Sequence, residues 1–155
     1  MKPLYIFDID GTLSDPEHRR HFVDGSQKKN WDEFYRLCFR DTPRLNVIFI
    51  LNALYKNGAD ILFFSGRRES CRKDTIQWLW TYTDINSFVL NQKGIITLRP
   101  DNDHTKDSIL KESWYDSLHN NDKNRLVGTF DDRNQVVDMW RSKNILCCQV
   151  APGDF

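Results

Sequence analysis

The sequence contains little of several residue types, and each scarcity excludes a class of protein. Only four of the 155 residues are cysteine and none forms a C-x-x-C pair, so we expect reduced thiols and no disulfide framework. None of the seven glycines belongs to a G-x-x-x-x-G-K-[ST] stretch, which excludes a phosphate-loop nucleotide-binding domain. Apolar runs are short, which excludes a membrane-spanning helix and a signal-peptide core and favours a cytoplasmic protein.

Net charge is also missing. The 22 basic residues balance 22 acidic ones, so no overall positive field marks a nucleic-acid-binding protein, and such a partner would need a local patch. The acidic residues are 18 aspartates and only four glutamates, a bias that favours turns, helix caps and metal sites over helix interiors. The length predicts one domain, residues 1–155, with one core and one active site.

Short apolar runs without clean alternation predict strands that are buried on both faces of a parallel sheet. The predicted strands are Leu4–Phe7, Ala59–Phe64, Leu126–Phe130 and Ile145–Val150, with Ser87–Leu90 as a weaker fifth. Stretches with apolar residues at helical spacing lie between them, so we expect a doubly wound α/β domain with a mostly parallel sheet. The best defined helix is Arg44–Lys56, with Thr42 as cap, Pro43 at the first helical position and Asn57-Gly58 at the end.

The polar stretch over residues 14–41 is too long for an ordinary loop between a strand and a helix. We expect it to form a small helical, cap-like insertion over the carboxyl edge of the sheet. Trp31, Phe34 and Tyr35 in this stretch can either pack the insertion onto the body, which is the commoner role, or stack on a nucleobase. Trp78, Trp80, Trp114 and Trp140 fall at helical spacing with aliphatic residues and are expected in the core.

The central chemical signal is the segment Asp8-Ile9-Asp10-Gly11-Thr12 directly after the first predicted strand. In an extended segment Asp8 and Asp10 would point to one side, and Gly11 would let the chain turn sharply away. Two neighbouring carboxylates repel unless a cation or a proton lies between them, so the pair favours a divalent metal ion and a phosphate site. An acidic turn without function is the alternative that the segment alone leaves open.

Three further clusters follow predicted strands or begin predicted helices. Ser65-Gly66-Arg67 offers backbone amides and a guanidinium, although it would also suit an ordinary turn. Asp131-Asp132 follows another strand, where adjacent residues should point in opposite directions, so only one is expected to contact a metal. Asp107 and Lys111 have the i, i+4 spacing of a helical ion pair. Open α/β sheets gather ligands outside the carboxyl ends of their strands, which favours one shared site.

The order D-x-D-G-T, S-G-R, lysine and D-D resembles the haloacid dehalogenase superfamily of phosphohydrolases. The string from Asp131 to Arg141, D-D-R-N-Q-V-V-D-M-W-R, and the tail from Gln149 to Phe155, Q-V-A-P-G-D-F, are similar to the phosphatase domain of phage polynucleotide kinase/3′-phosphatases. This likeness covers almost the whole chain, but the phosphate loop of the kinase domain is absent, so no kinase activity is expected. For a phage-encoded chain, the cytoplasm would be that of the host cell.

The resemblance implies a Mg²⁺-dependent phosphomonoesterase in which Asp8 attacks phosphorus and Asp10 serves as general acid and then base. This division requires a protonated Asp10 and an ionised Asp8. Mg²⁺ would be held by the Asp8 carboxylate, the main-chain carbonyl of Asp10 and Asp132, with Asp131 behind them. The remaining implied residues are Thr12, Ser65 and Gly66 around the phosphoryl group, Lys111 offsetting its charge, Asp107 orienting a basic residue, and Arg67 and Arg19 serving activity.

The implied substrate is the 3′-phosphate at a polynucleotide end. A nucleotidase or a general phosphatase for small molecules would use the same chemistry and stays open at this stage. A binding protein on the same fold that has lost turnover would normally lack Asp8 or Asp10, and both are present. A non-catalytic nucleic-acid repair module that only recruits partners is a further possibility, but it would not need a metal.

Overall fold

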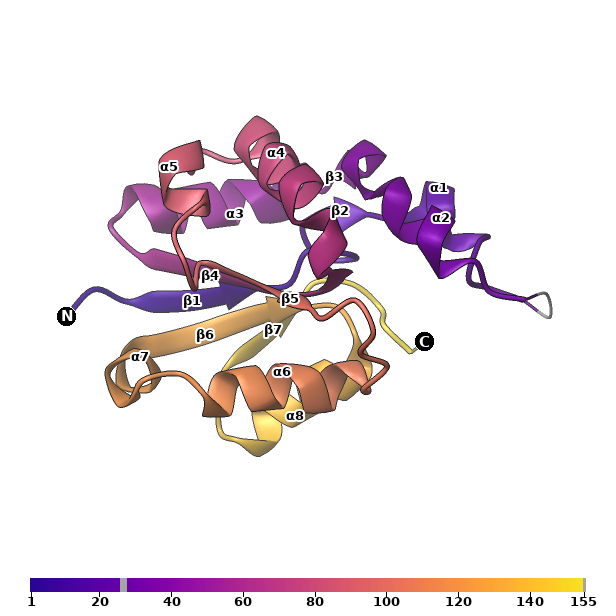
Figure 1. Ribbon diagram of the computed structural model, residues 1–155. Helices are drawn as coiled ribbons and strands as arrows, with labels where there is room; N and C mark the ends of the chain where they lie inside the picture. The colour runs from indigo at the N-terminus through magenta and orange to yellow at the C-terminus, as the bar shows by residue number, and fades with distance from the viewer. Residues whose placement is uncertain (26–27, 155) are drawn as a thin grey trace.

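A five-stranded parallel sheet forms the centre of the molecule in the computed structural model, which describes residues 1–25 and 28–154 (Figure 1). Phe155, the last residue of the tail motif, lies outside the described residues. The sheet order is β5-β4-β1-β6-β7, and every neighbouring pair runs parallel. The strands of this sheet are β1 (Leu4–Phe7), β4 (Asp60–Arg68), β5 (Ile96–Arg99), β6 (Leu126–Asp131) and β7 (Cys147–Gln149).

Helices cover both faces of the sheet, which confirms the predicted doubly wound α/β fold (Figure 1). One face carries α3 (Leu45–Lys56), α4 (Arg72–Tyr82) and α5 (Ser87–Leu90), and η2 (Glu69–Cys71) leads into α4. The other face carries α6 (Asp107–Asp116) and α8 (Asn134–Ser142), with α7 (Asn120–Arg125) just before β6. None of the helices in the described part of the chain has the length and apolar character that a membrane crossing requires.

Alternation along the strands divides the apolar side chains into two cores. Phe7, Ile61 and Phe63 face the α3 and α4 side, where Leu51 and Trp78 cover them. On the opposite face the buried residues are Ile6, Leu62 and Phe64 from the strands and Val137 and Trp140 from α8. The fully covered β1 and β4 explain why these strands appear as nearly continuous apolar runs.

Four strand predictions are confirmed, and the fifth is wrong. Ser87–Leu90 is the short helix α5, whose first turn is capped because the Asn86 side chain accepts a hydrogen bond from the Val89 amide. A four-residue apolar run cannot be assigned to a helix or a strand by periodicity alone. The fifth strand is β5, Ile96–Arg99, in which buried and half-buried residues alternate as they do at a sheet edge.

The prediction for helix Arg44–Lys56 is confirmed except at its start. The helix begins at Leu45, and Thr42-Pro43 is not its cap but the short strand β3 (Thr42–Pro43). β3 pairs antiparallel with β2 (Ser14–Asp15), so the helix start is displaced by a tertiary pairing that local sequence does not reveal. The predicted end at Asn57-Gly58 is confirmed, with Gly58 in the left-handed region at φ +87°.

The β2–β3 pair closes the base of the helical segment predicted over residues 14–41. Between the two strands lie α1 (Glu17–Arg20), α2 (Trp31–Arg36) and the 3₁₀ helix η1 (Cys38–Arg40). Figure 1 shows α1 and α2 beyond the carboxyl ends of the parallel strands. Of the four tryptophans predicted in the core, Trp78 and Trp140 are buried, whereas Trp80 is 52% exposed.

Candidate active site

Asp8 follows the end of β1 at the centre of the sheet. Its amide donates to the carbonyl of Phe130 on β6, which continues the strand pairing as far as the catalytic candidate. The side chain is buried, and its Oδ1 accepts a hydrogen bond of 2.7 Å from the Lys111 ammonium on α6. Its other oxygen, Oδ2, accepts a bond of 3.2 Å from the Thr12 hydroxyl. The carboxyl group of Asp8 is therefore fixed from two sides.

Lys111 is the positive centre of a buried acidic cluster. Its ammonium also lies 2.8 Å from Asp131 and 3.4 Å from Asp107, so one cation faces three carboxylates. The predicted i, i+4 pair of Asp107 and Lys111 is thus present, but as a buried element of the site. The Arg99 guanidinium adds a second cation 3.3 Å from Asp107, whereas Asp8 and Asp131 share the Lys111 ammonium.

Asp8, Asp131 and Asp132 form a group that suits a divalent cation. Each offers a carboxylate oxygen, and these atoms all lie within 4.8 Å of one another. Burial, reinforced by the neighbouring Asp8 and opposed by Lys111 and Arg133, raises the pKa of Asp132 to about 7. Carboxylate oxygens are the ligands that Mg²⁺ prefers. The residues present therefore fit the predicted metal.

Gly11 makes room for this group. It has φ +87°, and a Cβ atom at this position would lie 2.1 Å from Oδ2 of Asp132. Any other residue would thus push the Asp132 carboxylate away or strain the backbone. The sharp turn expected of Gly11 is accordingly coupled to the acidic group itself.

The prediction that Asp131 and Asp132 point in opposite directions is wrong. Both Asp131 and Asp132 reach the acidic group, because β6 ends at Asp131 and the chain leaves the extended conformation there. The two carboxylates still differ in their partners. Asp131 receives the Lys111 ammonium at 2.8 Å and the Arg133 amide at 3.1 Å, so its two oxygens are already engaged.

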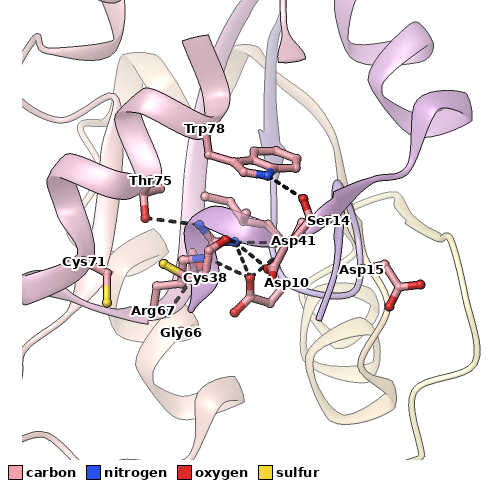
Figure 2. Close-up of polar contacts among 12 residues, drawn as sticks. Asp10, Ser14, Asp15, Cys38, Asp41, Gly66, Arg67, Cys71, Thr75 and Trp78 are labelled. Atoms are coloured by element: carbon pink, nitrogen blue, oxygen red, sulfur yellow. Dashed lines mark hydrogen bonds and ion pairs between the residues drawn. The ribbon is translucent and has the colours of Figure 1, made fainter. Parts of the chain in front are cut away.

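Asp10 faces a different set of residues from Asp8. Its carboxylate lies 2.8 Å from the guanidinium of Arg19 on α1 and 2.8 Å from that of Arg67 on β4. Both arginines also bind Asp41, which receives two bonds from Arg19, of 2.7 and 2.6 Å, and one of 2.9 Å from Arg67. Figure 2 shows the Arg67 guanidinium between Asp10 and Asp41. The result is a buried network of two cations and two anions.

Arg19 and Arg67 lie behind Asp10 rather than on the wall of the pocket. Both side chains are fully buried, whereas the Asp10 carboxylate keeps 21% of its surface exposed. Ser14 adds a bond of 3.2 Å to Asp10, and Thr75 accepts one of 3.3 Å from Arg67. This geometry holds the Asp10 carboxylate at the pocket surface and keeps the guanidinium groups behind it.

The protonation states run opposite to those expected from the sequence. Burial, helped by the Asp131 carboxylate and opposed by Lys111, raises the pKa of Asp8 to about 7. Burial acts in the same sense on Asp10, but Arg19 and Arg67 outweigh it and hold the pKa of Asp10 well below its ordinary value. The protein without ligands therefore favours the ionised form of Asp10 more strongly than that of Asp8. A cation at the acidic group would lower the pKa of Asp8, as an opposite charge does.

The residues predicted around the phosphoryl group differ in their access to the pocket. Gly66 lines it, and a Cβ atom there would lie 3.0 Å from the Asp107 carboxylate, so the small residue leaves space. Thr12 and Ser65 are buried, and their hydroxyls bond to the Asp8 carboxylate and the Arg67 amide. They shape the floor of the site from beneath.

Sequence reasoning missed two residues that organise the site. Asp41 joins both buried arginines but lies at the end of a polar segment, where nothing in the local pattern marks it. Arg99 ends β5 and bonds to the Gly66 carbonyl at 3.3 Å, the Thr105 carbonyl at 2.6 Å and Asp107 at 3.3 Å. Recognising β5 from its alternation would have placed Arg99 at a carboxyl strand end, where site residues gather.

An open pocket of about 510 Å³ lies above these groups. Asp8, Asp10, Asp131 and Asp132 lie on its acidic side. Its rim carries six basic residues, Arg20, Lys29, Arg68, Arg99, Lys106 and Arg133, together with three acidic ones, Asp24, Asp103 and Asp107. Trp31, Phe34 and Tyr35 add an aromatic wall from α2. A buried acidic floor beneath a basic and aromatic rim can receive an anionic ligand that carries a ring.

Comparisons with known proteins agree with this arrangement. The family described as "Polynucleotide kinase PNKP phosphatase domain" matches residues 2–155. A protein of Autographa californica nuclear polyhedrosis virus, provisionally named a bifunctional polynucleotide kinase/RNA ligase, is 32% identical over 141 residues. That match covers 90% of this chain but only 18% of the viral protein, so the relative is much longer.

Solved structures give the same assignment. Two structures of the Pnkp1/Rnl/Hen1 RNA repair complex match with TM-scores of 0.72 and 0.76, at 29% and 30% identity. Both matches cover 99% of this chain, and they cover 44% and 47% of the matched chains, respectively. A class C acid phosphatase from Bacillus anthracis shares the fold, with a TM-score of 0.61 and 20% sequence identity. The match covers 99% of this chain and 69% of the acid phosphatase chain. The chain belongs to the polynucleotide kinase PNKP phosphatase domain family of the haloacid dehalogenase superfamily.

Proposed function

We propose that this protein is a Mg²⁺-dependent phosphomonoesterase that removes the 3′-phosphate from polynucleotide ends through an aspartyl-phosphate at Asp8. The observation that carries the proposal is the position of Asp8: a buried carboxylate fixed by Lys111 and Thr12, facing an open pocket beside two further aspartates. A nucleophile needs such fixation because its attack requires a defined line of approach.

In the first step, an oxygen of Asp8 attacks phosphorus and the bond from phosphorus to the 3′-oxygen breaks. Lys111, 2.7 Å from Asp8, offsets the negative charge shared by the nucleophile and the phosphoryl group. Asp8 and Asp132 would hold Mg²⁺, which screens the two anions from each other when bound. Asp131 accepts hydrogen bonds from the Lys111 ammonium and the Arg133 amide, and we assign it to holding Lys111 rather than to direct ligation.

Asp10 transfers the protons. It gives a proton to the leaving 3′-oxygen and then takes one from the water that attacks phosphorus, which frees Asp8 and inorganic phosphate. Arg19 and Arg67 hold the carboxylate in position at the pocket surface. The two arginines also lower the pKa of Asp10, which disfavours its protonated form. The phosphate dianion of a bound substrate beside Asp10 raises that pKa again and so favours the protonated form that the first step needs.

The polynucleotide end is supported by the rim of the pocket and by the family. A basic and aromatic rim suits a nucleoside and its neighbouring phosphates better than it suits a small polar phosphate ester. The viral relative is named for a polynucleotide kinase and an RNA ligase, and one matched complex is named for RNA repair. This chain spans less than half of the length of the viral protein and of the matched chains of the two Pnkp1/Rnl/Hen1 structures. We propose that residues 14–41 form the cap that selects the substrate within the single domain 1–155.

The proposal is tested by phosphate release from three substrates with and without Mg²⁺: a 3′-phosphorylated oligonucleotide, its 5′-phosphorylated isomer and a nucleoside 3′-monophosphate. We expect the highest kcat/KM for the 3′-phosphorylated oligonucleotide, and no turnover after chelation. DNA and RNA versions of this oligonucleotide report the preferred nucleic acid. Equal rates on both isomers would contradict the assignment to 3′ ends.

A nucleotidase is the second candidate, because the pocket of about 510 Å³ could also hold a mononucleotide. In that case the nucleoside 3′-monophosphate would be hydrolysed with a kcat/KM at least equal to that of the oligonucleotide. The same three substrates therefore separate the two functions.

A further inference from the structure

Three aromatic residues of α2 form a compact cluster at the pocket. The rings of Trp31 and Tyr35 are stacked, with centroids 5.9 Å apart and planes inclined by 25°. Phe34 meets both rings edge-on, at 5.7 Å from Trp31 and 5.3 Å from Tyr35. Packing of α2 onto the body of the protein would explain this cluster if all three rings contacted the body.

Two of the three rings, those of Phe34 and Tyr35, contact the body in this way. Phe34 covers the Arg19 guanidinium, which lies 4.2 Å from its ring centroid, and so closes the buried network behind Asp10. Tyr35 donates a hydrogen bond of 3.2 Å from its hydroxyl to the Gly66 carbonyl, which joins α2 to the end of β4. These two residues attach the cap to the site.

Within residues 1–25 and 28–154, the ring and cation contacts of Trp31 are with Phe34, Tyr35 and Lys29, which all belong to the cap. Trp31 is 37% exposed, belongs to the wall of the pocket that also contains Asp8, and is supported by Tyr35 on one face. The first position of α2 and the Asn30 cap, which accepts a bond from the Glu33 amide, hold it in place. A fixed indole at the mouth of a phosphate site is a preformed surface for a flat ring.

Cations flank this surface. The Lys29 ammonium lies 5.6 Å from the centroid of the Trp31 ring, and the Arg68 guanidinium lies 5.0 Å from that of Tyr35. Both cations line the same pocket. Aromatic rings alternating with cations are the pattern by which proteins bind single-stranded nucleic acid, since the rings stack on bases and the cations meet phosphates.

We propose that Trp31, backed by Tyr35, is the stacking site for the terminal nucleobase of the polynucleotide end, and that Lys29 and Arg68 meet the next phosphate. This inference rests on the proposed function and adds to it the part of the substrate that the cap recognises. Stacking tolerates every base, so the site favours a nucleoside over a baseless ester without selecting a sequence.

The test compares kcat/KM on two 3′-phosphorylated oligonucleotides that differ only in the last residue, which carries a base in one and is abasic in the other. The variants are Trp31→Ala and Trp31→Phe, and the matched control is Trp80→Ala. Trp80 is also exposed, at 52%, but lies on α4 beside a separate hollow lined by Glu69 and Lys73.

We expect Trp31→Ala to lower kcat/KM on the base-bearing end by about 5- to 150-fold, the equivalent of one stacked base. The abasic end should change less than about twofold, Trp31→Phe should retain most of the activity, and Trp80→Ala should behave as the wild type. An equal loss on both ends would show that Trp31 only packs the cap, and would overturn the inference. No loss on either end would overturn it as well.

Failure of the proposed function is a different result. A wild-type protein that hydrolyses a nucleoside 3′-monophosphate but neither oligonucleotide would contradict the assignment to polynucleotide ends and, with it, this inference. A wild-type protein that hydrolyses both oligonucleotides equally well would leave the proposed function standing and would contradict only the stacking site.

Discussion

Replacing Lys111 with Met removes the positive centre of the acidic cluster while keeping a side chain of similar length. The ammonium is 1% exposed and lies within 3.4 Å of three carboxylates, those of Asp8, Asp107 and Asp131. In Lys111→Met these acids keep their burial and lose the cation that they share. Removing one partner of a buried ion pair costs about 3 to 5 kcal/mol, because the remaining charge is left uncompensated.

The sign of the pH dependence follows from the carboxylates. Without the ammonium, the pKa of Asp8, already about 7, rises further, since Lys111 is the group that opposes the effect of burial. An acid with a raised pKa destabilises the folded state at high pH and ceases to do so as it takes up its proton. We therefore expect the variant to be destabilised by about 3 to 5 kcal/mol at pH 8 and by clearly less at pH 5.5.

Urea denaturation at pH 8 and pH 5.5, in the absence of divalent cations, measures this difference in the free energy of unfolding. Lys93→Met is the matched control, because Lys93 is exposed and such surface changes stay within about 0.5 kcal/mol. Turnover of the 3′-phosphorylated oligonucleotide should also fall by about 10²-fold or more. A Lys111→Met protein as stable as the control at pH 8 would refute the reasoning about uncompensated buried charge.

Three further predictions concern the acidic group and the network behind it. In wild-type protein without divalent cations, the free energy of unfolding should rise as pH falls from 8 to 5. The reason is that the raised pKa values of Asp8 and Asp132 make the folded state bind protons more tightly than the unfolded state does. Saturating Mg²⁺ should flatten this pH dependence in the same denaturation series. Gly11→Ala should abolish turnover and weaken Mg²⁺ binding in calorimetry at least tenfold, because the new Cβ would lie 2.1 Å from the Asp132 carboxylate. Mg²⁺ binding as tight as in the wild type would contradict this. Asp41→Asn should cost about 3 kcal/mol or more in urea denaturation, because Arg19 loses a buried bidentate partner, and a loss below about 1 kcal/mol would speak against that role.

The fold could be predicted wherever burial left a clear pattern. Leu4–Phe7 lies in the middle of the sheet and is covered on both faces, and its neighbour Leu126–Phe130 is buried from Gly128 onward, so their apolar runs identified them as strands. The error at Ser87–Leu90 and the omission of Ile96–Arg99 both concern one sheet edge and its neighbouring segment. There the apolar signal is short, and the Asn86 cap decides the helix.

The candidate site was accessible to prediction only in part. Asp8, Asp10 and Asp132 follow strand ends, and Lys111 lies one turn into the helix that begins at Asp107, so topology brings them to one edge of the sheet. Asp41 depends on tertiary contacts between the cap and β4, and no spacing in the sequence encodes such contacts.

The state of the carboxyl groups was also beyond sequence reasoning. The strong lowering of the Asp10 pKa comes from two buried guanidinium groups that converge on it from α1 and β4. Such convergence is visible only once the cap is placed over the sheet. The motif predicts which residues take part, and the fold determines how they are charged.

The covalent intermediate is the central claim, and chemical trapping tests it most directly. A sample turning over a 3′-phosphorylated oligonucleotide with Mg²⁺ is quenched and treated with borohydride, which reduces an acyl phosphate to an alcohol. The proposed mechanism predicts that mass spectrometry finds homoserine in place of aspartate at position 8, and at no other aspartate, only when substrate and Mg²⁺ are both present. Substrate turnover with an unmodified Asp8, or with the reduced residue at Asp10, would contradict it.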